Sequence, residues 1–178
     1  MVAVLLANGF EEIEALTPVD VLRRAGLDVK TVAITADTAT GSHGISVACD
    51  LRAEELDTDT VDCVIFPGGM PGAINLDASP YTDKILDSVI KKGGLVAAIC
   101  AAPLVLGRRG FLKGRKATCY PGFESELVGA TVMDEGVVTD GKIVTARGMG
   151  VALDFSLELV SLLVSKEKAD EISLAICK

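Results

Sequence analysis

The 178-residue sequence contains no tryptophan, a single histidine and few aromatic residues of any kind. Aromatic residues make up 4% of the chain and hydrophobic residues 49%, so alanine, valine, leucine and isoleucine must fill the core. A chain of this length and apolar content suffices for one substantial domain. Because no linker, repeat or low-complexity tract interrupts it, we expect a single domain over residues 1–178.

Positive charge is scarce as well, and 17 lysines and arginines against 25 acidic residues give a net charge of -8. Such a chain repels a phosphate backbone, and without a basic block it is a poor partner for nucleic acid. No apolar run reaches membrane-spanning length, which argues against a membrane protein. The apolar start MVAVLLANGF lacks a positive leader and predicts a buried first strand, not a signal peptide.

The five cysteines, at positions 49, 63, 100, 119 and 177, form neither a CxxC motif nor a Cys/His metal pattern. Their odd number and irregular spacing favour free thiols in a reducing, cytoplasmic compartment, and we expect no bound metal. No GxGxxG motif follows the first apolar run, and no GK[ST] follows PGGMPG. Nucleotide binding is therefore disfavoured, and no cofactor is expected.

Short apolar runs alternate along the chain with helical patterns. The runs predict strands at 2–7, 28–34, 62–69 and 95–99, helices at 11–26, 79–94, 150–164 and 166–177, and hairpins at 41–50 and 136–146. Pro18 is expected to kink or divide the first helix. Continuous apolar strands separated by helices predict a doubly wound, mostly parallel α/β sheet with helices on both faces. Reactive groups in such folds gather beyond the carboxyl ends of the strands.

The stretch GGLVAAICAAPLVLG, residues 93–107, places Cys100 between a predicted strand and a predicted helix. Small residues at 98 and 102 flank it as in a nucleophile elbow, a sharp turn that exposes the reactive side chain. Helix-end electrostatics of up to ~2 kcal/mol would bring the pKa of the thiol from ~8.5 to about 7. The alternative interpretation is a cysteine packed in the core.

Three carboxylates follow the first predicted strand, at Glu11, Glu12 and Glu14. Glu12 and Glu14 are too close in sequence to share one helix face, so at most one should point at the cleft while the others cap the helix or face solvent. A buried carboxyl that stays protonated can donate a hydrogen bond to a thiolate and carry a proton. His43 lies in a predicted hairpin and is expected to be a solvated loop residue, not a catalytic partner.

The glycine-rich segment PGGMPG, residues 67–72, follows the third predicted strand. The backbone N–H of Gly69 can face the cleft and, together with that of Ala101, form an oxyanion hole. An ordinary glycine-rich connection is an equally good interpretation of the segment.

Four segments together, ANGFEEIEALTPVDVLRRAG, VIFPGGMPGAINL, GLVAAICAAP and VTARGMG, resemble the ThiJ/PfpI superfamily. Within it the sequence is most similar to the branch of the parkinsonism-associated protein DJ-one and its bacterial relatives. The resemblance covers essentially the whole chain in order. It implies a flavodoxin-like fold and a homodimer.

The resemblance also implies roles for single residues. Cys100 corresponds to the reactive cysteine and Glu14 to the protonated glutamate that hydrogen-bonds the thiolate. Gly69 and Ala101 correspond to the backbone donors. Further site neighbours implied by the family are Arg24, Arg147 and Gly148.

The sequence departs from the family pattern at two positions. Tyr120 stands before a proline where some members have a histidine, and Ala101 stands where protease-like members have a histidine after the cysteine. Both departures weaken a peptidase interpretation, because a peptidase must protonate an amine leaving group. Cys119 lies beside Tyr120 and can be a resolving thiol, although buried packing is the favoured account.

Among the activities that the resemblance implies, we expect that of a cysteine-dependent, cofactor-free glyoxalase or deglycase in oxidative and carbonyl stress defence. Its substrates would be methylglyoxal-type 2-oxoaldehydes, or their early glycation adducts on proteins or nucleotides, and its products 2-hydroxy acids. The alternative is a redox sensor or redox-regulated chaperone, because an exposed thiol of low pKa oxidises readily.

Overall fold

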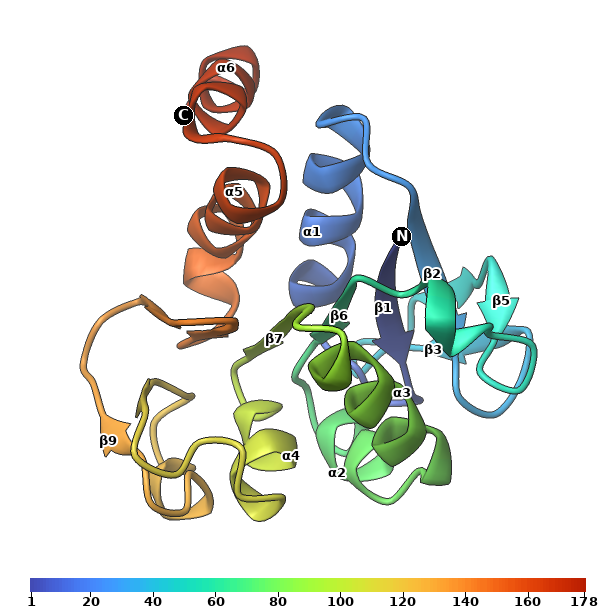
Figure 1. Cartoon of the computed structure of the whole chain (residues 1–178). Coiled ribbons are helices and arrows are strands. Elements are labelled where there is room, and N and C mark those ends of the chain that lie inside the picture. Colours follow the sequence, from blue (N-terminus) through green and yellow to red (C-terminus); the bar gives the residue numbers. More distant parts are fainter.

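A seven-stranded sheet forms the centre of the protein in a computed structural model that describes residues 1–178 (Figure 1). Its strand order is β10-β11-β7-β6-β1-β2-β5, and only β10 runs antiparallel to its neighbour. In the register, Val4 of β1 lies opposite Thr31 of β2 and Ile65 of β6. The strands are β1 (Val2–Leu6), β2 (Val29–Ala33), β5 (Leu51–Arg52), β6 (Cys63–Phe66), β7 (Leu95–Ile99), β10 (Val137–Asp140) and β11 (Ile143–Ala146).

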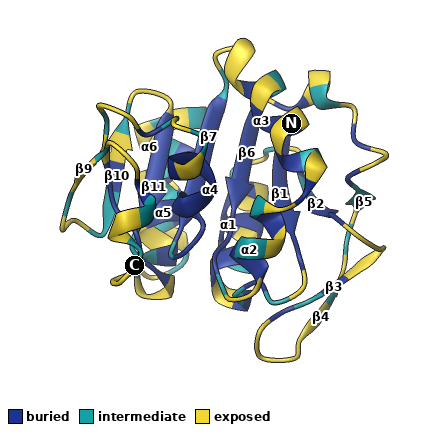
Figure 2. Ribbon diagram, turned by 90° about the horizontal axis from the view of Figure 1, so that it is seen from below, coloured by how far each residue is buried: buried dark blue, intermediate teal, exposed yellow.

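Helices cover both faces of this sheet. They are α1 (Glu12–Arg24), α2 (Gly72–Asp77), α3 (Pro80–Lys91), α4 (Pro103–Arg108), α5 (Ala152–Leu163) and α6 (Lys166–Ala175). The first, fifth and sixth enclose one core cluster against the sheet, and α2, α3 and α4 enclose the other. The central strands are buried along their whole length, as Figure 2 shows in dark blue. The predicted flavodoxin-like, doubly wound α/β fold is confirmed.

The predicted elements are present with small shifts of their ends. Ser79 caps α3 and Pro80 is its first residue, as the sequence indicates. The hairpin predicted at 41–50 begins earlier, with β3 (Thr38–Thr40) paired to β4 (Ser46–Ala48) across a five-residue loop. The sequence does not predict the six-residue helix α2 or the small sheet of β8 (Lys116–Ala117) and β9 (Thr131–Val132). Elements this short are too brief to show a hydrophobic periodicity.

Pro18 lies inside α1 and does not divide it, so the prediction of two helical pieces is wrong. A proline there removes the backbone N–H that would bond the carbonyl of Glu14. Burial of Ala15, Val19 and Leu22 in the core cluster beneath α5 holds the helix together across that gap.

The chain reverses its winding direction at β1, which pairs with β2 on one side and β6 on the other. The connections after β1 and β6 therefore turn to opposite faces of the sheet, and the carboxyl edge between them is where a doubly wound fold places its crevice. Two hydrogen bonds tie these loops together, from Glu11 N–H to the Gly68 carbonyl (3.0 Å) and from Gly72 N–H to the Gly9 carbonyl (3.1 Å). The first turn of α1 is thereby fixed beside the loop after β6. None of the helices combines the length and the apolar character needed to cross a membrane.

Candidate active site

Cys100 occupies the sharp turn between β7 and α4 and has a backbone φ of 64°. This left-handed conformation costs a residue with a side chain roughly 1–2 kcal/mol. Two hydrogen bonds hold it in place: Cys100 N–H donates to the Ala146 carbonyl (2.9 Å), and the Cys100 carbonyl accepts from Tyr120 N–H (2.8 Å). The predicted elbow is present, and its side chain is partly exposed where the two core clusters meet.

Glu14 is the carboxylate that points at Cys100, and the two side chains are hydrogen-bonded. It lies in the first turn of α1 and is 1% exposed. Its Oε2 accepts the N–H of Gly68 at 3.0 Å, and the N–H of Met149 donates to the same carboxyl group. Burial raises the pKa of Glu14 to about 7, so the group retains its proton far above the range of an exposed glutamate.

The thiol and the carboxyl group must be treated as one titrating pair. Burial and the facing Glu14 carboxylate raise the pKa of Cys100 to about 12, against the opposing influence of two backbone N–H groups. The pKa of about 7 that helix-end electrostatics predict for Cys100 is therefore wrong while Glu14 is ionised. When Glu14 carries the proton, the repulsion between the carboxylate and the thiolate disappears, and the carboxylic acid donates a hydrogen bond to the sulfur. Between about pH 7 and 12 the pair holds a single proton.

Two backbone N–H groups converge on the sulfur from different loops, that of Gly69 after β6 and that of Ala101 after β7. Each favours the thiolate, and the structure brings together the two donors that the sequence singles out. Gly69 has a φ of 85°, which only glycine adopts without strain. The interpretation of PGGMPG as an ordinary connection is therefore insufficient.

Gly68 has a part in the site that sequence reasoning missed. A Cβ at this position would lie 2.6 Å from the Cβ of Cys100 and 2.6 Å from Oε2 of Glu14. Only glycine fits between the thiol and the carboxyl group, and its N–H holds the latter in place. The doubled glycine of PGGMPG was the signal that could have revealed this.

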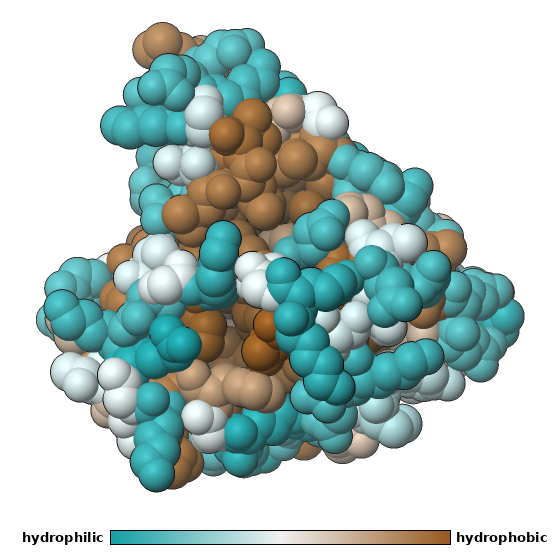
Figure 3. All heavy atoms as spheres, viewed as in Figure 1, coloured by the Kyte–Doolittle hydropathy of each residue, from teal (hydrophilic) through white to brown (hydrophobic).

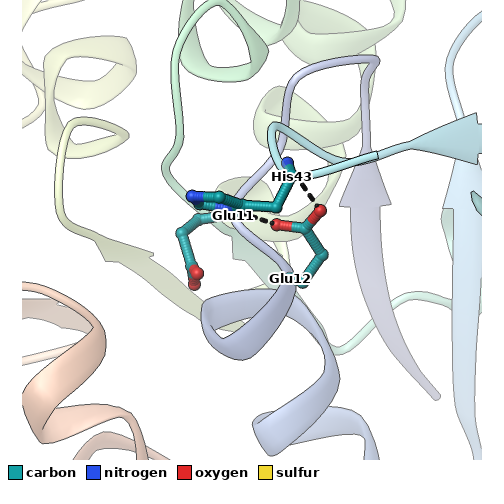
Figure 4. A group of neighbouring side chains, drawn as sticks. All are labelled: Glu11, Glu12 and His43. Carbon is teal, nitrogen blue, oxygen red and sulfur yellow. Dashed lines mark hydrogen bonds and ion pairs between the residues drawn. The ribbon is translucent and has the colours of Figure 1, made fainter. Parts of the chain in front are cut away.

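Glu12 binds His43 of the loop between β3 and β4, as Figure 4 shows. It accepts the His43 backbone N–H at 2.8 Å and lies 3.0 Å from the ring Nδ1. Although burial opposes ionisation, these bonds lower the pKa of Glu12 to about 2, and the same side-chain bond raises the pKa of His43. The expectation that Glu12 caps the helix or faces solvent is wrong, because the loop between β3 and β4 covers it.

Glu11 provides the cap instead, accepting the Glu14 N–H at 2.7 Å. The ligand atoms of Glu11, Glu12 and His43 lie within 4.8 Å of one another, a spacing that suits a metal ion. Because the Glu12 oxygens already accept hydrogen bonds from the loop, the group forms an internal ion pair. His43 is exposed and has no hydrogen bond to Cys100 or Glu14.

The remaining predicted neighbours divide into two groups. Tyr120 and Arg147 line a hollow beside the reactive pair. Cys119 is 4% exposed in a core cluster, and burial raises its pKa to about 11, which supports packing rather than a resolving role. Arg24 pairs with Asp20 and lies about 15 Å beyond Glu14 along α1, at ~1.5 Å per residue, so it is not a neighbour of Cys100 in this chain.

The Glu14 carboxyl group should control how readily the thiol of Cys100 ionises. In Glu14→Leu the facing carboxylate that keeps the thiol protonated is absent, so the midpoint of thiolate formation should fall by roughly one pH unit or more. Glu14→Gln keeps an N–H donor that cannot ionise and should have a lower midpoint than the leucine variant. The measurement is thiolate absorbance against pH, with Cys100→Ser as the blank and the exposed Glu54→Leu as the control. Equal midpoints in Glu14→Leu and the unmodified protein would remove Glu14 from the account.

The profile of the DJ-1/PfpI family matches residues 1–162. The chain is 40% identical to Protein DJ-1 homolog B of Arabidopsis thaliana, over 97% of this chain and 40% of that protein, so it spans less than half of that relative's length. It is 32% identical to the Glutathione-independent glyoxalase DJR-1.2 of Caenorhabditis elegans, over 94% of this chain and 90% of that one.

A solved structure described as Toxoplasma gondii DJ-1, oxidized, superimposes with a TM-score of 0.94 and 36% identity, over 99% of this chain and 97% of the other. The family profile extends over most of the chain, and the superposition covers 99% of it. The chain therefore belongs to the DJ-1/PfpI family.

Proposed function

We propose that the protein is a cofactor-free glyoxalase or deglycase that uses Cys100 to convert 2-oxoaldehydes, or their early glycation adducts, to 2-hydroxy acids. The observation that carries the proposal is the pairing of Cys100 with a buried Glu14 whose pKa is about 7. Such a pair supplies a nucleophile and a proton carrier within one hydrogen bond. The name of the Caenorhabditis elegans relative, a glutathione-independent glyoxalase, supports the same activity.

The reaction begins with the proton on Glu14 and the negative charge on the sulfur. The thiolate attacks the aldehyde carbon, a C–S bond forms, and the aldehyde oxygen takes the proton of Glu14 to give a hemithioacetal. The N–H groups of Gly69 and Ala101, which already face the sulfur, stabilise the charge that develops on that oxygen.

The second stage moves hydrogen between the two adjacent carbons. The Glu14 carboxylate removes the C–H proton of the former aldehyde carbon and delivers it to the neighbouring carbon, while the hydroxyl proton passes to the neighbouring oxygen. The aldehyde carbon is oxidised and the ketone carbon reduced, so no external oxidant is required. Water then cleaves the resulting thioester. Its hydroxyl group completes the 2-hydroxy acid, its other proton returns to Glu14, and the sulfur of Cys100 leaves as the thiolate.

This chemistry tolerates the absence of a histidine at the site. Tyr120 and Ala101 stand where related proteins can carry one, and His43 is engaged with Glu12. A peptidase must protonate an amine leaving group, whereas addition to an aldehyde has no leaving group. Peptidase activity is therefore not proposed.

The purified protein should convert methylglyoxal to lactate without glutathione, and Cys100→Ser should reduce the rate to the uncatalysed background. Loss is expected because the serine hydroxyl keeps its proton at neutral pH and is a poor nucleophile. Lactate is measured enzymatically, and Cys177→Ser, which changes an exposed cysteine, is the matched control. Equal rates for the unmodified protein and Cys100→Ser would overturn the proposal.

A second candidate function, a redox sensor or redox-regulated chaperone, is favoured by the partial exposure of Cys100. A thiolate in this position can be oxidised by peroxide to the sulfenic and then the sulfinic acid. A protonated Glu14 can donate a hydrogen bond to the sulfinate and stabilise it. The oxidised state named for the Toxoplasma gondii relative supports this candidate. All five cysteines are free, which agrees with a reducing cytoplasmic setting.

Mild peroxide treatment should add two oxygen atoms to Cys100 before it modifies any other cysteine. Cys63 and Cys119 are buried, so their sulfur atoms are shielded from the oxidant. The order of modification is measured by mass spectrometry of peptides, and the exposed Cys177 provides the internal control. Oxidation of Cys177 ahead of Cys100 would contradict a sensor role.

We also propose that a second copy of the chain covers an apolar face on α1 and α5. Figure 3 shows apolar surface gathered in this region, around a groove of about 580 Å³. Ile13 and Leu153 are 47% and 40% exposed there, which is unusual for large aliphatic side chains. Asp20 and Arg24 border the same groove as an ion pair, so two copies packed antiparallel would oppose acid to base.

Ile13→Asp should convert the proposed dimer to a monomer, because it would bury an unpaired charge at the centre of the interface. The mass in solution is measured by light scattering during size-exclusion chromatography. Val128→Asp, at an exposed aliphatic position away from this groove, is the control and should leave the mass unchanged. A monomeric unmodified protein, or a dimeric Ile13→Asp variant, would contradict the interface.

A further inference from the structure

A hollow of about 260 Å³ opens beside the reactive pair, here called the Tyr120 hollow. Its lining includes Tyr120, Pro121, Arg147, Gly148, Met149 and Val151. The proposed reaction uses none of these side chains. The hollow is a candidate for the part of the substrate that does not react.

The floor of the hollow reaches the catalytic carboxyl group. A Cβ placed on Gly148 would lie 3.3 Å from the Tyr120 ring and 3.9 Å from Oε1 of Glu14. The lining is also joined to the reactive pair through the backbone, since Tyr120 N–H donates to the Cys100 carbonyl and Met149 N–H to Glu14. A substrate bonded to the sulfur therefore has its substituent next to this space.

The walls of the hollow favour an apolar and preferably aromatic group. Tyr120 and Met149 are 50% and 54% exposed, so each leaves a large face free for a ligand. Tyrosine rings stack on flat groups, and methionine sulfur contacts ring edges favourably. The one charged residue of the lining, Arg147, is paired with Asp134. Nothing in the hollow therefore demands a charged substituent.

The size of the hollow also exceeds what the smallest 2-oxoaldehyde needs. At ~30 Å³ per water molecule, 260 Å³ corresponds to about nine waters. Methylglyoxal places only a methyl group beside its reacting carbons and would leave most of this volume to solvent. A phenyl or branched aliphatic substituent would displace that water and bury apolar surface.

We propose that the Tyr120 hollow is the subsite for the substituent of the substrate, and that the protein prefers 2-oxoaldehydes with an aromatic or branched substituent over methylglyoxal. This inference rests on the proposed glyoxalase function. Tyr120 and Met149 determine the specificity, and Gly148 keeps the floor of the hollow open. The reacting carbons remain between Cys100 and Glu14, and the chemistry is the same for both classes of substrate.

The test compares initial rates with phenylglyoxal and with methylglyoxal at equal enzyme concentration. The unmodified protein should show a kcat/KM for phenylglyoxal roughly tenfold or more above that for methylglyoxal. Tyr120→Ala removes the stacking face, and Gly148→Ala fills the floor. Both should lower the ratio of the two kcat/KM values by roughly tenfold, mainly through KM for phenylglyoxal. Gly148 has a φ of 162°, which alanine adopts without strain.

Tyr81→Ala is the matched control, because Tyr81 is the only other tyrosine and lies on α3, outside the lining of the hollow. In Tyr81→Ala the ratio of kcat/KM for phenylglyoxal to kcat/KM for methylglyoxal should equal that of the unmodified protein. Two results would overturn the inference while the proposed function stands. In the first, both aldehydes are converted but the unmodified protein favours methylglyoxal. In the second, the ratio of the two kcat/KM values is the same in Tyr120→Ala and Gly148→Ala as in Tyr81→Ala. If neither aldehyde is converted in a Cys100-dependent way, both are overturned.

Discussion

One proton shared between Glu14 and Cys100 is the interaction on which the site depends. Burial raises the pKa of the carboxyl group from 4.5 to about 7, which corresponds to roughly 3 kcal/mol in favour of the protonated acid. The ionised carboxylate, conversely, holds the thiol in its protonated form. The pair therefore carries one negative charge at neutral pH, and its reactivity depends on which atom holds the proton. The two backbone N–H groups on the sulfur favour the reactive arrangement, with the proton on Glu14.

The fold produces this pair by bringing three loops to one edge of the sheet. The reversal of winding at β1 opens the crevice, and hydrogen bonds between the loops after β1 and β6 fix Glu14 beside Gly68. The strained backbone of Cys100 is held by β11 on one side and by Tyr120 on the other. Gly68 permits the close approach because any side chain would overlap both reacting groups. A rigid backbone thus determines where a single proton can move.

Much of this arrangement could be read from local sequence patterns. The alternation of apolar runs and helices predicts the sheet and its helical layers, and small residues around Cys100 predict the elbow. The choice among three neighbouring glutamates could not be made locally, because the partner that engages Glu12 is His43, 31 residues away along the chain. The pKa of Cys100 cannot be predicted locally for a similar reason, since its burial and its facing carboxylate are both tertiary effects. The family pattern supplied Glu14, but it also suggested Arg24, which this chain keeps away from the thiol.

Neutron diffraction from crystals exchanged into heavy water at about pH 9, between the two titrations, tests the central claim most directly, because it locates the proton itself. The account predicts a single deuterium on the pair, shared between a carboxyl oxygen of Glu14 and the sulfur atom of Cys100. Deuterium on both groups at once, or on neither, would contradict it.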